Sequence, residues 1–451
     1  MSLEILDKNQ AIDLVLDLAS KEGAQAEVIL DSAHNFSLKA QKGALSEVVA
    51  SSSQVMGLRL VHQQRTTVTS SESLSRDSLE IMVRDAIALA ALSKQAPEHE
   101  LMPIGNSVKW DSELTAPKDE VDLDKKSELA LSLESEILKK GNGVKSAPYN
   151  GYSEGISERT IANTHGLLTS YQDSHKGCYT SALIERDGDQ AMSHYSSSDR
   201  LFKNLDSELC ISQSFERANA LIGAKGLTTG RYDVVFETNI LQSFWGTFSN
   251  IFSAKATVNG LNPFSNKMNQ LVASTELTIT DRPLVTGGLR TQFFDDEGAA
   301  SSDVTLIEKG VFKNFLHNHQ TALKLKMPNN HRASRSCKSH LSVGHTHFCI
   351  SPGSNKESEV MGGENLLVIT SIQGLSSGSS DISGDFSCGV SGLLYSNGEI
   401  VKAFKGVTLS GNWWDMLSSR LSMIGDQIHS SPSKSFYAPT LRWSELQIAG
   451  S

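Results

Sequence analysis

The chain has 451 residues, of which 39% are hydrophobic and 20% are charged, and its formal net charge is -10. At about 150 residues per domain this length predicts two or three domains, and the composition is that of a folded globular protein rather than a disordered chain. The acidic balance argues against nucleic acid as a partner, because a surface that binds phosphates needs clustered Lys and Arg.

The N-terminal stretch MSLEILDKNQAIDLVLDLASKEG has acidic residues where a signal peptide needs a basic start, so we expect no targeting segment. No apolar run approaches the roughly 18 residues of a membrane span. The five cysteines are odd in number and lack paired spacing, which favours reduced thiols over a disulfide framework: Cys178, Cys210, Cys337, Cys349 and Cys388. We therefore expect a cytoplasmic protein that does not contact a membrane.

Helices and strands alternate in the first half of the chain. Asp7 stands as the N-cap of a helix that ends at Gly23, and residues 26–31 and 46–71 have the β-branched composition of strands. Ser75 caps a second helix with one apolar stripe, and a third helix begins near Asp122. Residues 151–200 then alternate in the manner of strands, and residues 205–222 have a helical pattern.

A turn-rich stretch, GLTTGR at residues 226–231, predicts a boundary between an N-terminal domain, residues 1–225, and a C-terminal domain, residues 226–451. Strand patterns dominate beyond it. The exception is residues 239–254, where apolar side chains at helical spacing behind Asn239 as N-cap predict a buried helix. The sequence thus predicts an α+β protein with an N-terminal α/β domain and a β-rich C-terminal domain.

The stretch VGHTHFC raises the question of a metal, because His345, His347 and Cys349 occupy every second position. Alternate side chains of a strand share one face, so the three could form most of a zinc site. An exposed strand face also tolerates imidazoles, and this is the interpretation we favour. Four further histidines lie nearby in the sequence: His317, His319, His331 and His340.

Two charged segments have both a functional and a structural interpretation. Asp295, Asp296 and Glu297 could bind a cation or transfer protons, but a tight polar turn closed by Gly298 is favoured, and the same holds for Asp381 and Asp385. The basic run from Lys324 to Lys338 is expected to be a solvated loop.

Three stretches, found in this order, resemble the TldD/PmbA family. They are MGLRLVHQQRTTVTSSESLSRDSLEIMVRDAIALA, FFDDEGAASSDVTLIEKGVFKNFLHNHQTALKL and ISGDFSCGVSGLLYSNGEIVKAFKGVTLSGNWWDML. The resemblance spans nearly the whole chain and is to the PmbA branch, also called TldE and named as a modulator of DNA gyrase. It implies an N-terminal α/β domain followed by a β-rich domain whose curved sheet encloses a large cavity.

In the TldD branch, a helix of the C-terminal half carries the zinc-binding signature HExxxH. The corresponding positions here, residues 246–251, read GTFSNI, and no His, Asp, Glu or Cys occurs anywhere from Thr238 to Thr275. The resemblance therefore implies that this chain has no catalytic residue, cofactor or metal of its own, and that zinc belongs to a TldD-like partner.

The function that the resemblance implies is that of a non-metal-binding subunit in a heterodimeric zinc metallopeptidase that processes or degrades small unfolded peptides. Two alternatives stay open: a self-sufficient hydrolase with an unrecognised site, and a non-proteolytic modulator of DNA gyrase. A homodimer is expected for the isolated chain, because the surface that meets the partner would otherwise be exposed.

Overall fold

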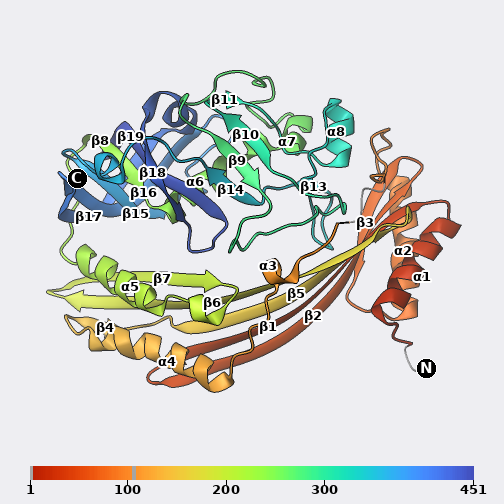
Figure 1. Cartoon of the computed structure of the whole chain (residues 1–451), viewed down its shortest axis with the longest axis horizontal. Coiled ribbons are helices and arrows are strands. Elements are labelled where there is room, and N and C mark those ends of the chain that lie inside the picture. Colours follow the sequence, from red (N-terminus) through yellow and green to blue (C-terminus); the bar gives the residue numbers. More distant parts are fainter. Residues whose placement is uncertain (1–3, 104–107, 451) are drawn as a thin grey trace.

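The computed structural model describes residues 4–103 and 108–450, and these form two large sheets (Figure 1). The first sheet has seven strands: β1 (Gln25–Gln41), β2 (Ala44–His62), β3 (Arg65–Ser71), β4 (Val144–Ser146), β5 (Gly151–Asn163), β6 (Leu168–Arg186) and β7 (Asp189–Asp199). Its strand order is β3-β2-β1-β5-β6, with β4 and β7 both paired to β6, and all the pairings are antiparallel. The long strands bend strongly and pass beneath the C-terminal half of the chain (Figure 1).

Helices cover the outer face of this sheet, where alternate residues near both ends of β1 are apolar. Val28 and Leu30 pack against the first two helices, and Leu38 and Ala40 pack near the fourth. The helices of this half are α1 (Lys8–Lys21), α2 (Arg76–Leu92), α3 (Ser112–Thr115), α4 (Leu123–Lys139) and α5 (Ser207–Leu221). The other face of β1 meets the C-terminal half.

Local signals in the sequence predicted the first helices well. The carboxylate of Asp7 accepts a hydrogen bond from the backbone of Gln10, and the hydroxyl of Ser75 accepts one from Ser78, so both predicted N-caps are confirmed. The predicted cap of the buried helix is wrong by two residues, since the N-cap is Glu237 rather than Asn239.

The C-terminal half contains a ten-stranded sheet. Its strands are β8 (Gly230–Phe236), β9 (Ile279–Arg282), β10 (Val304–Glu308), β11 (Val311–Phe312), β14 (His347–Ile350), β15 (Leu366–Gln373), β16 (Asp385–Ser396), β17 (Glu399–Asn412), β18 (Leu421–Ser430) and β19 (Phe436–Ala449). Because β19 pairs with both β17 and β8, five of these strands close into a ring, β8-β15-β16-β17-β19. A separate pair is formed by β12 (Ala333–Ser334) and β13 (Ser342–Val343).

The helices of this half are α6 (Thr238–Phe248), α7 (Ala254–Val258), α8 (His319–Leu325), α9 (Glu357–Val360) and α10 (Trp413–Asp415). The apolar face of α6 lies in the largest core cluster, where the ring of Phe244 lies 4.8 Å from that of Phe236 and 5.2 Å from that of Trp413. These contacts fix α6 against the sheet.

The predicted α+β class with a strongly curved sheet is confirmed. The curvature is plainest in the long strands of the N-terminal half (Figure 1). The five-strand ring of the C-terminal half packs apolar side chains into the largest core cluster. The predicted boundary at residues 225 and 226 falls between α5 and β8. Among the described residues, no helix is long and apolar enough to cross a membrane.

Candidate functional site

The helix α6 stands where the resemblance places the zinc-binding helix of the TldD branch. Its buried side is entirely apolar, and its exposed side presents Ser243 and Gly246, with Asn250 in the turn that follows. A side chain added at Gly246 would meet no atom within 4 Å, so this position opens onto free space. The amide of Asn250 donates a hydrogen bond of 2.6 Å to Asp381. This surface offers hydroxyl and amide groups but no acid, base or thiol of its own.

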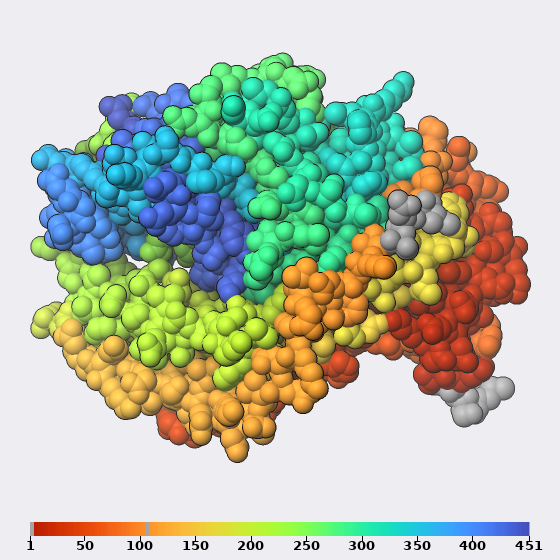
Figure 2. All heavy atoms as spheres, viewed as in Figure 1, coloured from red at the N-terminus to blue at the C-terminus, as the bar shows by residue number. Residues whose placement is uncertain are grey.

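Two cavities lie between the inner face of the N-terminal sheet and the loops of the C-terminal half. One has a volume of about 480 Å³ and the other about 280 Å³, and both are lined by Arg159, Tyr171 and Asp173. Small side chains such as Ser53 and Ser157 line the larger one. We call these two cavities together the interdomain cleft. The space-filling view shows a further hollow between the yellow-green strands and the blue C-terminal strands (Figure 2).

Two carboxylates of the interdomain cleft are paired with the same arginine. The guanidinium of Arg159 donates hydrogen bonds of 2.7 Å to Asp31 and to Asp296, which joins the two halves of the chain. Burial, together with the neighbouring Asp31 carboxylate, raises the pKa of the Cys337 thiol to about 12. A protonated thiol and paired carboxylates are poor nucleophiles and bases, so this cleft is suited to binding a polar chain rather than to proton transfer.

The residues of the VGHTHFC stretch have separate surroundings. Nδ1 of His347 donates to the carbonyl of Arg282 at 2.8 Å, and the amide of Arg290 donates to Nε2 at 3.0 Å, so both ring nitrogens bind backbone. Burial lowers the pKa of His347 to about 4 and raises that of Cys349 to about 11. His345 lies before β14, lines the smaller cavity of the cleft, and contacts the backbone oxygen of Thr346. His347 therefore has a structural role.

Within residues 4–103 and 108–450, no three or more His, Cys, Asp or Glu side chains lie in an arrangement that could hold a metal ion. That statement includes the other four histidines of this region. His317 is buried, and burial lowers its pKa to about 4, whereas His319 contacts Glu100 at 3.1 Å. Metal binding by His345, His347 and Cys349 gains no support from this geometry, and the absence of a metal in this chain stays a prediction.

The acidic triplet forms the predicted turn. The amide of Asp295 donates to the carbonyl of Ala299 at 2.8 Å, and Gly298 adopts a φ of 80°, a left-handed conformation that favours glycine. The Asp295 carboxylate accepts from the amides of Glu297, Ala299 and Ala333. The turn is thus fixed by its own backbone.

The triplet also takes part in a buried charge network that the sequence analysis missed. Glu27 on β1 binds Arg59 on β2 at 3.1 Å and Arg335 at 3.1 Å, and Arg59 also binds Glu297 at 3.1 Å. We call these four residues the buried charge network. Burial opposes the charge on Glu27, but the charges of Arg59 and Arg335 outweigh it and hold the pKa of this carboxyl below its ordinary value. The network fastens the C-terminal loops to the N-terminal sheet.

The prediction of a solvated loop from Lys324 to Lys338 is wrong for two of its residues. Arg332 and Arg335 are buried, because Arg332 pairs with Asp281 and Arg335 with Glu27. The backbone of Cys337 packs so closely on Gly57 of β2 that a side chain there would overlap it. The sequence signal for the contacts of Arg335 was a charge flanked by apolar residues in a predicted strand: Glu27 in AEVILD and Arg59 in MGLRLVH.

Comparison with known proteins gives a consistent family assignment. Domain 1 of the PmbA/TldA metallopeptidases matches residues 26–90, their central domain matches residues 116–222, and their C-terminal domain matches residues 229–450. A metalloprotease PmbA homolog from Haemophilus influenzae is 24% identical over 438 residues, covering 94% of this chain and 92% of the relative. The metalloprotease PmbA of Escherichia coli O157:H7 is 23% identical, covering 98% and 96%.

Solved structures share the fold over nearly the whole chain. TldE from Thermococcus kodakarensis superposes with a TM-score of 0.86 at 17% identity, and the match covers 98% of this chain and all of that one. A Thermotoga maritima protein whose name links it to modulation of DNA gyrase superposes with a TM-score of 0.87 at 23% identity and the same coverage.

Proposed function

Because the chain belongs to the PmbA/TldD metallopeptidase family, we propose that it is the non-metal-binding, PmbA/TldE-like subunit of a TldD-type zinc metallopeptidase complex. The complex processes or degrades small unfolded peptides. In this complex the partner holds the zinc, while this chain forms part of the wall of the substrate-binding cavity and orients the peptide.

The observation that carries the proposal is the chemistry of α6. A zinc peptidase needs ligands for the metal and a carboxylate that activates its water. The helix that fills this place in the fold, together with the segment up to Thr275, contains no His, Asp, Glu or Cys. On α6 and the turn after it, Gly246 and Asn250 leave the exposed surface open and without an ionisable side chain, which suits a wall that contacts a peptide through hydrogen bonds.

An open sheet edge supports assembly with a partner. In the described part of the chain, β3 pairs with β2 only at residues 56–62, so residues 44–55 of β2 leave one edge without a neighbouring strand. This edge carries exposed apolar side chains, since Val48 is 56% exposed and Val49 is 40% exposed. Long uncovered strand edges invite pairing with another chain. We propose that a TldD-like subunit covers this edge and that a second copy of this chain does so when the partner is missing.

The cytoplasm is the proposed location. All five cysteines are free thiols in the structure, and four of them are buried. A chain with unpaired buried thiols is suited to a reducing compartment.

The experiment compares peptide cleavage by three samples: this chain alone, a TldD-like subunit alone, and the two mixed. A flexible fluorogenic peptide serves as substrate. We expect negligible cleavage by this chain alone, a gain on mixing, and loss of the gain when a zinc chelator is added.

Cleavage by this chain alone would instead establish the self-sufficient hydrolase. If mixing gives no cleavage and the purified chain changes supercoiling by DNA gyrase in a protease-free assay, the non-proteolytic modulator replaces the proposal.

A further inference from the structure

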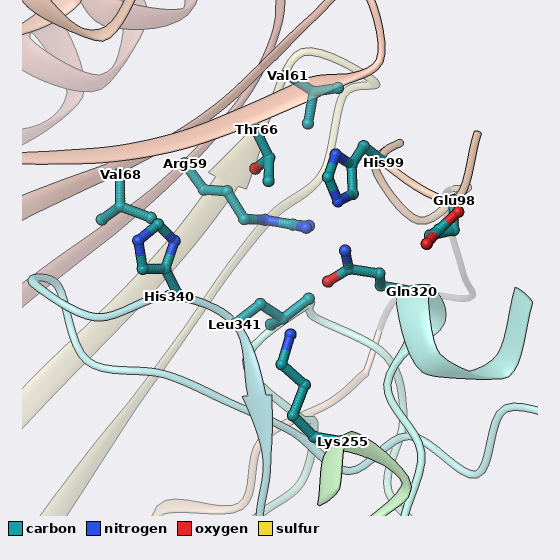
Figure 3. A pocket seen from close by; sticks show the side chains of 10 residues that line it. All are labelled: Arg59, Val61, Thr66, Val68, Glu98, His99, Lys255, Gln320, His340 and Leu341. Atoms are coloured by element: carbon teal, nitrogen blue, oxygen red, sulfur yellow. The ribbon is translucent and has the colours of Figure 1, made fainter. Parts of the chain in front are cut away.

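A smaller cavity, separate from the interdomain cleft, lies at the junction of the β2–β3 hairpin with α7 and α8 (Figure 3). Its volume is about 120 Å³, and it lies outside α6 and the interdomain cleft. Its lining combines charged, amide and apolar side chains: Arg59, Val61, Thr66, Val68, Glu98, His99, Lys255, Gln320, His340 and Leu341.

Arg59 supplies a buried donor to this cavity. The residue is only 4% exposed, its Nε and Nη2 atoms bind Glu27 and Glu297, and Nη1 has no acceptor among the described residues. The end of the Arg59 side chain points into the centre of the cavity (Figure 3). The two carboxylates fix the orientation of the guanidinium, and its Nη1 group stays available. Nη1 is therefore a preorganised hydrogen-bond donor for an anion.

Lys255 and Gln320 complete the set of donors. The amino group of Lys255 points toward the same centre as the amide of Gln320 (Figure 3). Within the described ranges, neither side chain makes an ion pair or a hydrogen bond, although both are half-buried. Partly buried donors without acceptors are costly unless water or a ligand satisfies them.

The charge of the cavity favours one negative ligand. Glu98, the carboxylate in the lining, points away from the centre and pairs with Lys324 (Figure 3). The buried charge network that holds Arg59 is neutral, with two arginines against two glutamates. Lys324 neutralises Glu98, so the positive charge of Lys255 is left over in the lining. Burial lowers the pKa of His99, so its ring adds no charge at neutral pH.

We propose that this cavity binds the carboxylate of a short alkyl acid. The donors of Arg59, Lys255 and Gln320 bind the two carboxylate oxygens, and the alkyl group contacts the apolar side chains that line the same cavity, Val61, Val68 and Leu341. Such a carboxylate can belong to a free small acid or to the C-terminal residue of a short peptide. The binding site does not depend on the peptidase proposal, because none of its lining residues belongs to α6.

Isothermal titration of the full chain with butyrate tests the proposal, with butyramide as the neutral counterpart. We expect one saturable butyrate site and no binding of butyramide. Lys255→Met keeps the length of the side chain and should weaken butyrate binding by about tenfold or more, because it removes a charge-assisted hydrogen bond. Gln320→Leu should weaken it as well, whereas Lys267→Met, at an exposed lysine outside the cavity, should leave it unchanged.

Two further probes identify the source of the ligand. Binding of N-acetylalanine at least as tight as that of butyrate would assign the site to a peptide terminus, and binding of butyrate alone would assign it to a free acid. The proposal is overturned if butyrate does not bind, if both variants bind it like the unaltered chain, or if inorganic phosphate binds in place of butyrate. A thermal melt of each variant establishes that the fold is intact.

Discussion

Replacing Glu27 by Gln should destabilise the protein strongly. Glu27 is fully buried and binds Nη2 of Arg335, while Nε and Nη1 of this arginine have no hydrogen-bond partner among the described residues. The variant removes the negative charge and leaves the Arg335 guanidinium buried without an ion pair. Loss of one member of a buried ion pair costs about 3–5 kcal/mol, because the remaining charge is neither paired nor hydrated.

Urea unfolding followed by tryptophan fluorescence measures this effect. Asp303→Asn is the matched control, since it breaks the Asp303–Arg282 pair, in which both side chains are more than half exposed. That exposed pair should contribute about 0–1 kcal/mol. Equal destabilisation by the two variants, or a loss below about 1 kcal/mol for Glu27→Gln, would refute the argument that the buried charge network fastens the two halves together.

The pH dependence of the same variant follows from the sign of the pKa shift. Because Arg59 and Arg335 hold the pKa of Glu27 below its ordinary value of 4.5 despite burial, ionised Glu27 stabilises the folded state above about pH 4.5. This contribution is lost as the pH falls through the lowered pKa. The difference in unfolding free energy between the original chain and Glu27→Gln should therefore shrink in acid. A difference that stays constant down to pH 3 would contradict the stabilising role of the ionised Glu27 carboxylate.

Three further predictions concern other parts of the molecule. Burial raises the pKa of Glu237 to about 7, although the charge of Arg217 opposes the shift. The free energy of unfolding should therefore fall as the pH rises from 5 to 7, by at most about 1.4 kcal/mol per pH unit. Urea unfolding at several pH values should show a flatter slope for Glu237→Gln. His347→Ala should cost about 1–3 kcal/mol by leaving two buried backbone groups unpaired, with metal content unchanged by elemental analysis. Val48→Lys should weaken binding of a TldD-like subunit, or of a second copy of this chain, measured by analytical ultracentrifugation. The free energy of unfolding of the isolated chain should change by less than about 0.5 kcal/mol, because Val48 is exposed.

Elements with strong local signals could be predicted from the sequence. The helices α1 and α2 carry a capping side chain and an apolar stripe, and both formed within a few residues of their predicted bounds. The strand β1 was predicted only for residues 26–31, yet it runs to Gln41. The apolar alternation breaks at residues 32–35, which are half-buried or exposed, so the length and curvature of the strand come from pairing with β2 and β5 rather than from local pattern.

The interdomain contacts could not be predicted, because they join residues that are far apart in the sequence. Arg332 and Arg335 lie in a segment whose local composition is that of a solvated loop, and their carboxylate partners precede them by 51 and 308 residues. Likewise, the alternation of His345 and His347 says nothing about the backbone groups of Arg282 and Arg290 that satisfy His347. Periodicity reports the face of a strand, whereas tertiary pairing determines what that face meets.

The metal content of the purified chain decides whether this subunit holds zinc of its own. Elemental mass spectrometry is performed on protein without a His-tag after dialysis without chelator. The account predicts well under one equivalent of zinc or any other transition metal per chain, because α6 and the segment up to Thr275 carry no ligand. One equivalent of bound zinc or manganese that resists dialysis would contradict it and would make His345 and Cys349 the first residues to substitute.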